Sequence, residues 1–255
     1  MTTLRVASEP LLRASVALVW LATAATCVHP YYASVGAQYL GRLHLGTAWM
    51  YATCAAEGVL GLVLLARPFG RWEALLQIAA VAVFTALLAA VEPMLLVSPF
   101  GMLSKNLPFV LVVWAAHRLA RGDAEVSVLP LVRVAAALPW LTEGLFPKLL
   151  FQQEVELSMA PAMGLVFARP GVIVGALGVA QLASGVLALT LRGRPLRALL
   201  ALQLAALVAL PVVIGWLAPW LWVHPFGPFS KNLPILAATW VALRGSRPSP
   251  AGATS

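Results

Sequence analysis

The stretch VHPFGPFSKNLP, residues 223–234, is a near-copy of the stretch VSPFGMLSKNLP, residues 97–108. Nine of the twelve positions agree, and the two copies lie 126 residues apart. The similarity continues far upstream of each phrase, where PLLR at residues 10–13 corresponds to PLVR at residues 130–133. The sequence therefore predicts one structural unit that is present twice in the chain.

The composition is that of a membrane protein. Hydrophobic residues make up 61% of the chain and charged residues only 10%, whereas roughly a quarter of the residues in soluble domains are charged. Several apolar runs reach the ~20 residues that a helix needs to cross a bilayer. The net charge of +8 comes from arginines in short loops, which favours membrane topology and anionic lipids over a nucleic-acid partner.

The apolar runs predict an all-α, polytopic fold, because barrel strands are shorter and alternate in polarity. Four spans in each unit give both units the same direction in the membrane. The fold is therefore predicted as two parallel four-helix-bundle repeats. We expect eight transmembrane helices, at about 11–29, 46–66, 72–93, 105–120, 130–147, 170–191, 196–217 and 231–244.

The basic residues predict the orientation. With the N-terminus in the cytoplasm, twelve of the 17 lysines and arginines lie on the inner side, as the positive-inside rule requires. Both termini are then cytoplasmic, in a bacterial-type inner membrane, and the first apolar run is a retained span. The predicted domains are a first repeat, a cytoplasmic linker, a second repeat and a disordered tail, at 1–120, 121–129, 130–246 and 247–255.

The repeated phrase contains a polar triplet that is predicted to start the fourth span of each repeat. Asn106 and Asn232 are expected as N-caps, followed by a proline in the first helical turn. Lys105 and Lys231 would stand at the positive end of a helix dipole. Either an anion, a carboxylate or a substrate oxygen pairs with each lysine, or the lysines snorkel to lipid headgroups.

Two glutamates within the predicted spans are functional candidates, because a charge inside the membrane is costly. Glu143 is expected near the outer end of the fifth span and Glu57 midway through the second. Lys148 is five residues beyond Glu143, so the two are not expected to face each other along one helix. Glu143 is instead expected to pair with Lys231 or Lys105, or else to fix helix packing only.

The remaining polar residues give no metal or haem motif. His224 completes the candidate polar site, but the histidines show no metal spacing and no facing pair that would hold a haem. Cys27 and Cys54 lack a CxxC spacing, so each is interpreted as a small buried residue rather than a redox partner. No catalytic residue can be assigned from these patterns.

The second half resembles the DoxX-like family of small four-helix membrane proteins. The resemblance rests on TEGLFPKLLF, residues 142–151, followed by HPFGPFSKNLP, residues 224–234, and covers about residues 130–244. The first half keeps PFGxxSKNLP but lacks the glutamate and lysine of the earlier motif. The resemblance implies a tandem pair of four-helix bundles and, for some members, sulfur, thiol or quinone oxidoreduction beside a soluble redox partner.

Three functions follow from these patterns. The first is a membrane subunit of a redox system that binds a quinone or another small lipophile at its outer face. Its polar groups would be Glu143, Lys231, Lys105 and His224, with aromatic walls of Phe226, Phe229, Trp220 and Trp222. Because the sequence shows neither CxxC nor a dinucleotide fingerprint, a quinone or another polypeptide would carry the electrons. The alternatives are a non-catalytic assembly or partner subunit, and a proton-coupled transporter that uses Glu57.

Overall fold

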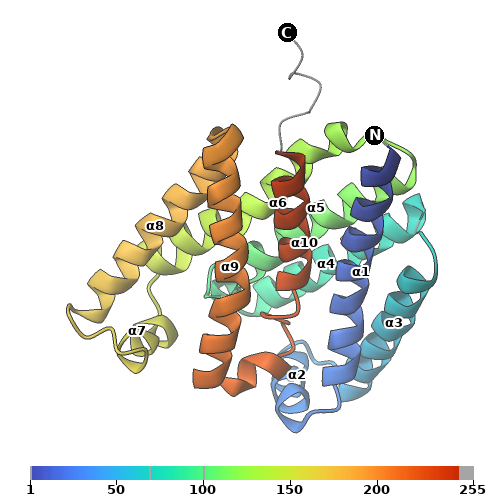
Figure 1. The fold of residues 1–255 in the computed structure, drawn as a ribbon. Helices are drawn as coiled ribbons and strands as arrows, with labels where there is room; N and C mark the ends of the chain where they lie inside the picture. Colours follow the sequence, from blue (N-terminus) through green and yellow to red (C-terminus); the bar gives the residue numbers. More distant parts are fainter. Residues whose placement is uncertain (1, 69, 100, 247–255) are drawn as a thin grey trace.

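The structure, a computed structural model, describes residues 2–68, 70–99 and 101–246. Within these ranges the chain is entirely helical and forms ten α-helices (Figure 1). The elements are α1 (Thr2–Thr26), α2 (Pro30–Arg42), α3 (Thr47–Ala66), α4 (Arg71–Val91), the 3₁₀-helix η1 (Pro93–Leu96), α5 (Met102–Ala120), α6 (Glu125–Leu145), the π-helix η2 (Phe146–Leu150), α7 (Glu154–Ala162), α8 (Pro170–Thr190), α9 (Gly193–Leu217), the 3₁₀-helix η3 (Pro219–Val223) and α10 (Asn232–Gly245).

Each predicted span corresponds to a long or central helix, but the boundaries differ. Helix α1 begins at Thr2 rather than near residue 11 and contains Pro10. Helices α2 and α7 were not predicted, because they are only 13 and 9 residues long and leave no membrane-length apolar run. The predicted linker 121–129 is partly helical, because α6 begins at Glu125. The predicted tail at 247–255 lies outside the described residues.

Several helices are long and apolar enough to cross a membrane. In the described residues there are five, namely α3, α4, α6 with η2, α8 and α9. A sixth results if α1 from Ser8 and α2, which are bent by 93° relative to each other, form one broken span. Helices α5 and α10 are not among them, and α10 has only 14 residues. The chain is thus a helical membrane protein, while eight crossings in two bundles remain a prediction.

The same order of elements occurs in the two halves of the chain. Each half has a long helix, a short helix, two long helices, a 3₁₀-helix and a final helix, with the π-helix added in the second half. The first and last helices meet in the centre, where α5 packs against α6 and α10, and α1 packs against α10. Their core includes Val16, Val112, Val132 and Ala238, all fully buried. The short helices α2 and α7 lie at the end of the bundle opposite the start of α1 and the end of α10 (Figure 1).

The outer helices expose apolar side chains on their outward faces. Leu62 of α3 is 62% exposed, and Leu202 of α9 is 68% exposed. A soluble protein seldom leaves so many large apolar residues open to water over whole helices. In a bilayer these faces contact lipid tails, and the hydrogen bonds within each helix satisfy its backbone. The exposed surface therefore supports a membrane location.

One duplicated arginine has the same role in both halves. Arg13 of α1 donates to the carbonyl oxygens of Leu64 and Leu65, at the end of α3. Arg133 of α6 donates to the carbonyl oxygens of Ala188 and Leu191, at the end of α8. The last carbonyls of a helix lack partners within it and carry partial negative charge. The arginine of the repeated PLxR segment therefore ties the first helix of each half to the C-terminus of its next long helix.

Candidate functional site

The repeated SKNLP phrase does not cap its helices with asparagine as predicted. Helix α5 begins at Met102 after Gly101, so Asn106 lies inside the helix. At α10 the N-cap position is Lys231, and Asn232 is the first helical residue. Pro234 lies in the first turn as predicted, whereas Pro108 lies in the second. The capping prediction was wrong because both asparagine side chains bind groups of the other half.

The lysine and asparagine of the two phrases exchange partners. Lys105 Nζ donates to Asn232 Oδ1 at 2.8 Å, and Lys231 Nζ donates to Asn106 Oδ1 at 2.8 Å. Lys105 is only 6% exposed, so it does not snorkel toward headgroups. Each lysine is therefore held by an amide oxygen of the opposite half, which is none of the partners predicted from the sequence.

A first cavity, of about 420 Å³, lies among the helices of the first half. Its wall is mostly apolar and aromatic and comes from α1, α2, α3, α4 and α5. Its polar groups include Glu57, Thr85 and Asn106, together with Lys231 from the second half. The amide of Asn106 also donates to Thr85 Oγ1 at 2.8 Å. The first half thus encloses a cavity to which the second half contributes a lysine.

A second cavity, of about 260 Å³, lies among α6, α7, α8 and α9. Its apolar wall includes Leu207, Leu210 and Phe229, and Lys105 of the first half reaches it. Since Asn232 lines it as well, the Lys105–Asn232 bond lies at its edge. Each cavity therefore contains a lysine that belongs to the other half of the chain.

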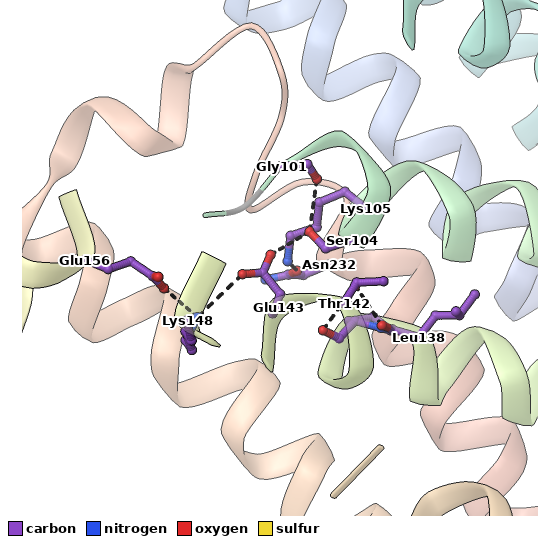
Figure 2. A network of polar contacts seen from close by, with 10 residues as sticks. Gly101, Ser104, Lys105, Leu138, Thr142, Glu143, Lys148, Glu156 and Asn232 are labelled. Atoms are coloured by element: carbon purple, nitrogen blue, oxygen red, sulfur yellow. Dashed lines mark hydrogen bonds and ion pairs between the residues drawn. The ribbon is translucent and has the colours of Figure 1, made fainter. Parts of the chain in front are cut away.

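A buried ion network lines the second cavity (Figure 2). Lys148 Nζ lies 2.5 Å from Glu156 Oε1 and 3.6 Å from Glu143 Oε2. The other oxygen of Glu143 accepts a hydrogen bond from Ser104 Oγ at 2.5 Å. Because Ser104 belongs to α5 and Glu143 to α6, this bond joins the two halves. Glu143 pairs with neither Lys105 nor Lys231, which corrects the expected pairing.

The π-helix explains why Glu143 and Lys148 meet. Pro147 has no N–H to donate to the carbonyl of Glu143, so the α-helical ladder breaks at this point. The backbone then widens, and the Phe151 N–H donates to the carbonyl of Phe146, five residues back, at 2.8 Å. This widened turn begins between the two residues, and Lys148 Nζ lies 3.6 Å from Glu143 Oε2. The inference that this spacing separates the two side chains was therefore wrong.

Three polar atoms on residues of the second cavity have no hydrogen-bond partner among the described residues. They are Trp140 Nε1, Gln181 Oε1 and Glu156 Oε2. The equivalent tryptophan of the first half, Trp20, donates to Gln77 Oε1 at 2.9 Å. Gln203, the counterpart of Gln77, instead donates to Ser184. Buried polar atoms are seldom left unpaired, so the second cavity has unused hydrogen-bonding capacity.

His224 lies outside both cavities, in an aromatic cluster. Its ring centroid is 4.8 Å from that of Phe226, 5.6 Å from that of Trp220 and 5.9 Å from that of Tyr31. Nδ1 accepts a hydrogen bond from the Phe226 N–H at 3.3 Å. Burial, with a further contribution from the charge of Lys231, lowers the pKa of His224 from 6.5 to about 4. The imidazole is therefore neutral at physiological pH.

Replacing His224 with glutamine is expected to reduce the acid sensitivity of the fold. Between pH 6.5 and about 4 the unfolded histidine is protonated while the folded one is not, so stability falls as the pH decreases through this window. Thermal unfolding at about pH 4.5 and pH 7.5 should show a smaller pH difference for His224→Gln than for the parent. His44→Asn, at an exposed position with φ of 56°, is the control. An unchanged pH difference in His224→Gln would contradict the assignment.

Cys27 and Cys54 are free thiols, and both are buried. They belong to one small apolar cluster with Tyr32 and Met50. The Cys54 sulfur lies 3.3 Å from the hydroxyl of Tyr32. The two cysteines therefore pack as small side chains near the first cavity.

The structure divides the predicted polar site between two places. Glu143, Lys148, Lys105 and Asn232 line the second cavity, whereas Glu57, Asn106 and Lys231 line the first. The expected aromatic wall is divided as well, because Phe226 lines the first cavity and Phe229 the second. Sequence reasoning missed Ser104, Glu156, Trp140 and Gln181. For Glu156 a signal was available, since this acid lies in the short polar segment QQEVELS, residues 152–158, that follows the PKLL segment.

Comparison with known protein families places the chain beside a family of membrane proteins. The model of the DoxX-like family matches residues 17–114 and, separately, residues 137–240. No curated protein and no solved structure matches the chain. The two matched regions together cover most of the sequence and correspond to the two halves in which the element order recurs.

Proposed function

Because the chain belongs to the DoxX-like family, we propose that it is a membrane protein that binds a small lipophilic molecule of the quinone class within a redox system. The proposal rests on the second cavity. There, an apolar wall adjoins a group of buried ions, and the indole N–H of Trp140 is unpartnered. Ligand sites in proteins combine these features, an apolar lining with a few polar groups that orient the ligand.

The charges of the second cavity favour an uncharged ligand. Lys105 and Lys148 contribute two positive charges, and Glu143 and Glu156 contribute two negative charges. A ligand of either charge would leave one buried charge without compensation, which is costly in a low-dielectric site. A neutral molecule that accepts hydrogen bonds meets the cavity without this cost.

A quinone head group satisfies the chemistry of the cavity. Its carbonyl oxygens accept hydrogen bonds, and the donors available are the Trp140 indole and the lysine ammonium groups. Its ring and tail suit walls made by Leu207, Leu210 and Phe229. The carboxyl groups of Glu143 and Glu156 would exchange the protons that accompany quinone reduction. The electrons would come from a partner protein.

We further propose a cytoplasmic location for both termini, in a membrane of the bacterial inner-membrane type. Helix α1 begins and helix α10 ends at the same end of the bundle (Figure 1). The excess of arginine in the loops at this end supports a cytoplasmic assignment. The short helices α2 and α7, which line the two cavities, would then lie on the outer side.

Replacing Trp140 with phenylalanine is expected to weaken quinone binding about tenfold, because one buried hydrogen bond is lost while the ring is kept. The protein in lipid nanodiscs would be titrated with a short-chain benzoquinone, with empty nanodiscs subtracted. Trp72→Phe, at a position 78% exposed on the outer surface, is the matched control and should bind as the parent does. Absence of saturable binding in the parent, or equal affinity in Trp140→Phe, would overturn the proposal.

A further inference from the structure

We propose that the first cavity is a second binding site, so that one chain binds two neutral, hydrogen-bonding lipophiles. The inference rests on the proposed function, since it assigns the same ligand class to a separate place. The first cavity is the larger, at about 420 Å³ against 260 Å³, and shares no lining residue with the second. Its volume lies within the ~300–1,000 Å³ typical of sites for small molecules.

The two cavities occupy equivalent places in the two halves. Val81 lines the first cavity, and Leu207, 126 positions later, lines the second. The same offset relates Asn106 to Asn232. Further pairs at this offset are Phe84 with Leu210, Thr85 with Pro211 and Leu88 with Ile214. A fold that builds one cavity in each half offers two sites of related shape.

The polar end of the first cavity contains a carboxylate and an amine. Glu57 lies on α3, and its Oε2 has no hydrogen-bond partner among the described residues. Lys231 uses one of its three N–H groups on Asn106, which leaves two for a ligand oxygen. When both groups are ionised their charges cancel, as do those of the second cavity. The first cavity therefore also favours an uncharged ligand with a hydrogen-bonding oxygen.

The two sites differ in their hydrogen-bond donors. In the first cavity the indole N–H of Trp20 already donates to Gln77 and is not available to a ligand. The ammonium donor there is Lys231. In the second, the indole of Trp140 is unpartnered and two lysines are present. The two sites should therefore bind the same ligand with different affinities. Loss of one lysine should affect only the cavity which that lysine lines.

Binding stoichiometry tests the inference. Equilibrium dialysis of the full chain in nanodiscs against a short-chain benzoquinone, with empty nanodiscs subtracted, should give two equivalents per chain. Thr53→Phe fills the first cavity and Ala206→Phe fills the second, since both residues line their cavities and are half-buried. Each variant should retain one equivalent, and the double variant should retain none. Thermal unfolding would confirm that each variant is folded.

Substitution of each lysine tests which half of the chain contributes a hydrogen-bond donor to which cavity. Lys231→Met, made in the Ala206→Phe background, should weaken the remaining equivalent at least tenfold, because a hydrogen bond from a charged group is lost. Lys105→Met in the same background should leave this equivalent unchanged. The reverse pattern would overturn the assignment of Lys231 to the first cavity.

The outcomes separate the two proposals. A single equivalent that is lost in Ala206→Phe and kept in Thr53→Phe would mean that the first cavity binds no ligand. This result would overturn the inference about the first cavity and leave the proposed function intact. Loss of both equivalents in Ala206→Phe would also overturn the inference about the first cavity, because the first cavity would then not bind the ligand independently. No binding above the empty-nanodisc background would instead contradict the proposed function itself.

Discussion

Replacing Lys148 with methionine is expected to lower the free energy of unfolding by about 3–5 kcal/mol, the usual cost of breaking a buried ion pair from one side. Lys148 lies between Glu156 and Glu143 at 2.5 and 3.6 Å. All three side chains are buried. Without the lysine, two carboxylates of the same charge remain close together in a site of low dielectric. Reversible unfolding in mixed detergent micelles measures the difference.

A second variant separates the charge effect from the lost packing. Lys148→Met with Glu156→Gln removes the closest ion pair, keeps similar shapes and leaves Glu143 balanced by Lys105, so most of the stability should return. Burial already raises the pKa of Glu156 while Lys148 lowers it, so without Lys148 protonation of this carboxyl becomes easier. Acidification should therefore reduce the penalty of Lys148→Met. A double variant as unstable as the single one would show that the network does not act through charge.

The exposed residue Arg169 is the control for the loss of a positive charge. Arg169→Met removes one cation at the N-cap of α8 without leaving a buried carboxylate. We expect a change within about 0.5 kcal/mol, as for most surface substitutions. A loss comparable to that of Lys148→Met would mean that net charge, rather than burial, accounts for the effect.

Replacing Gly144 with alanine is expected to destabilise the protein by about 1–3 kcal/mol, the usual cost of overpacking. A Cβ at this position would lie 2.7 Å from the carbonyl oxygen of Gly178 and 2.7 Å from the backbone nitrogen of Leu182. These are backbone atoms of α8, which cannot rotate away as a side chain could. Helices α6 and α8 would have to separate beside Glu143. Small residues commonly allow such close approach between membrane helices.

Gly41→Ala is the matched control for this substitution. Gly41 is also helical, in α2, but a Cβ there would meet nothing within 4 Å. Alanine is favoured over glycine in a helix by about 1 kcal/mol, so Gly41→Ala should be neutral or stabilising. Thermal unfolding should show a lower melting temperature for Gly144→Ala and an unchanged or higher one for Gly41→Ala. Shifts of the same sign would contradict the close approach of α6 and α8.

Hydropathy was enough to locate the long helices, because a membrane-length apolar run has few alternatives to a helix. It could not reveal α2 or α7, whose few turns leave no comparable run. These two helices matter because both line the cavities, through residues such as Tyr39 and Glu156. A division into two cavities therefore could not be foreseen from the spans alone.

The polar site was only partly predictable for a different reason. Glu143 and the two lysines stood out because charge inside an apolar chain is costly. Their partners depend on backbone details that spacing does not encode. Pro147 indicated a disturbance, but nothing in the sequence showed that the helix would widen to a π-helix and bring Lys148 onto the face of Glu143. Likewise, an amide oxygen in the other half could not be chosen as the partner of Lys105 without the packing of α5 against α10.

The exchange between Lys105 and Asn232, and between Lys231 and Asn106, has the form of an isologous contact in a twofold dimer. In such a dimer, residue i of one subunit meets residue j of the other, and j meets i. Here the two subunits are the halves of a single polypeptide, joined by the short loop between Ala120 and Glu125. A single unit carrying this phrase could have paired with its own copy through the same two bonds. Fusion of the two units would then have allowed the cavities to diverge, one around Glu57 and the other around Glu143, without loss of the contact that joins them.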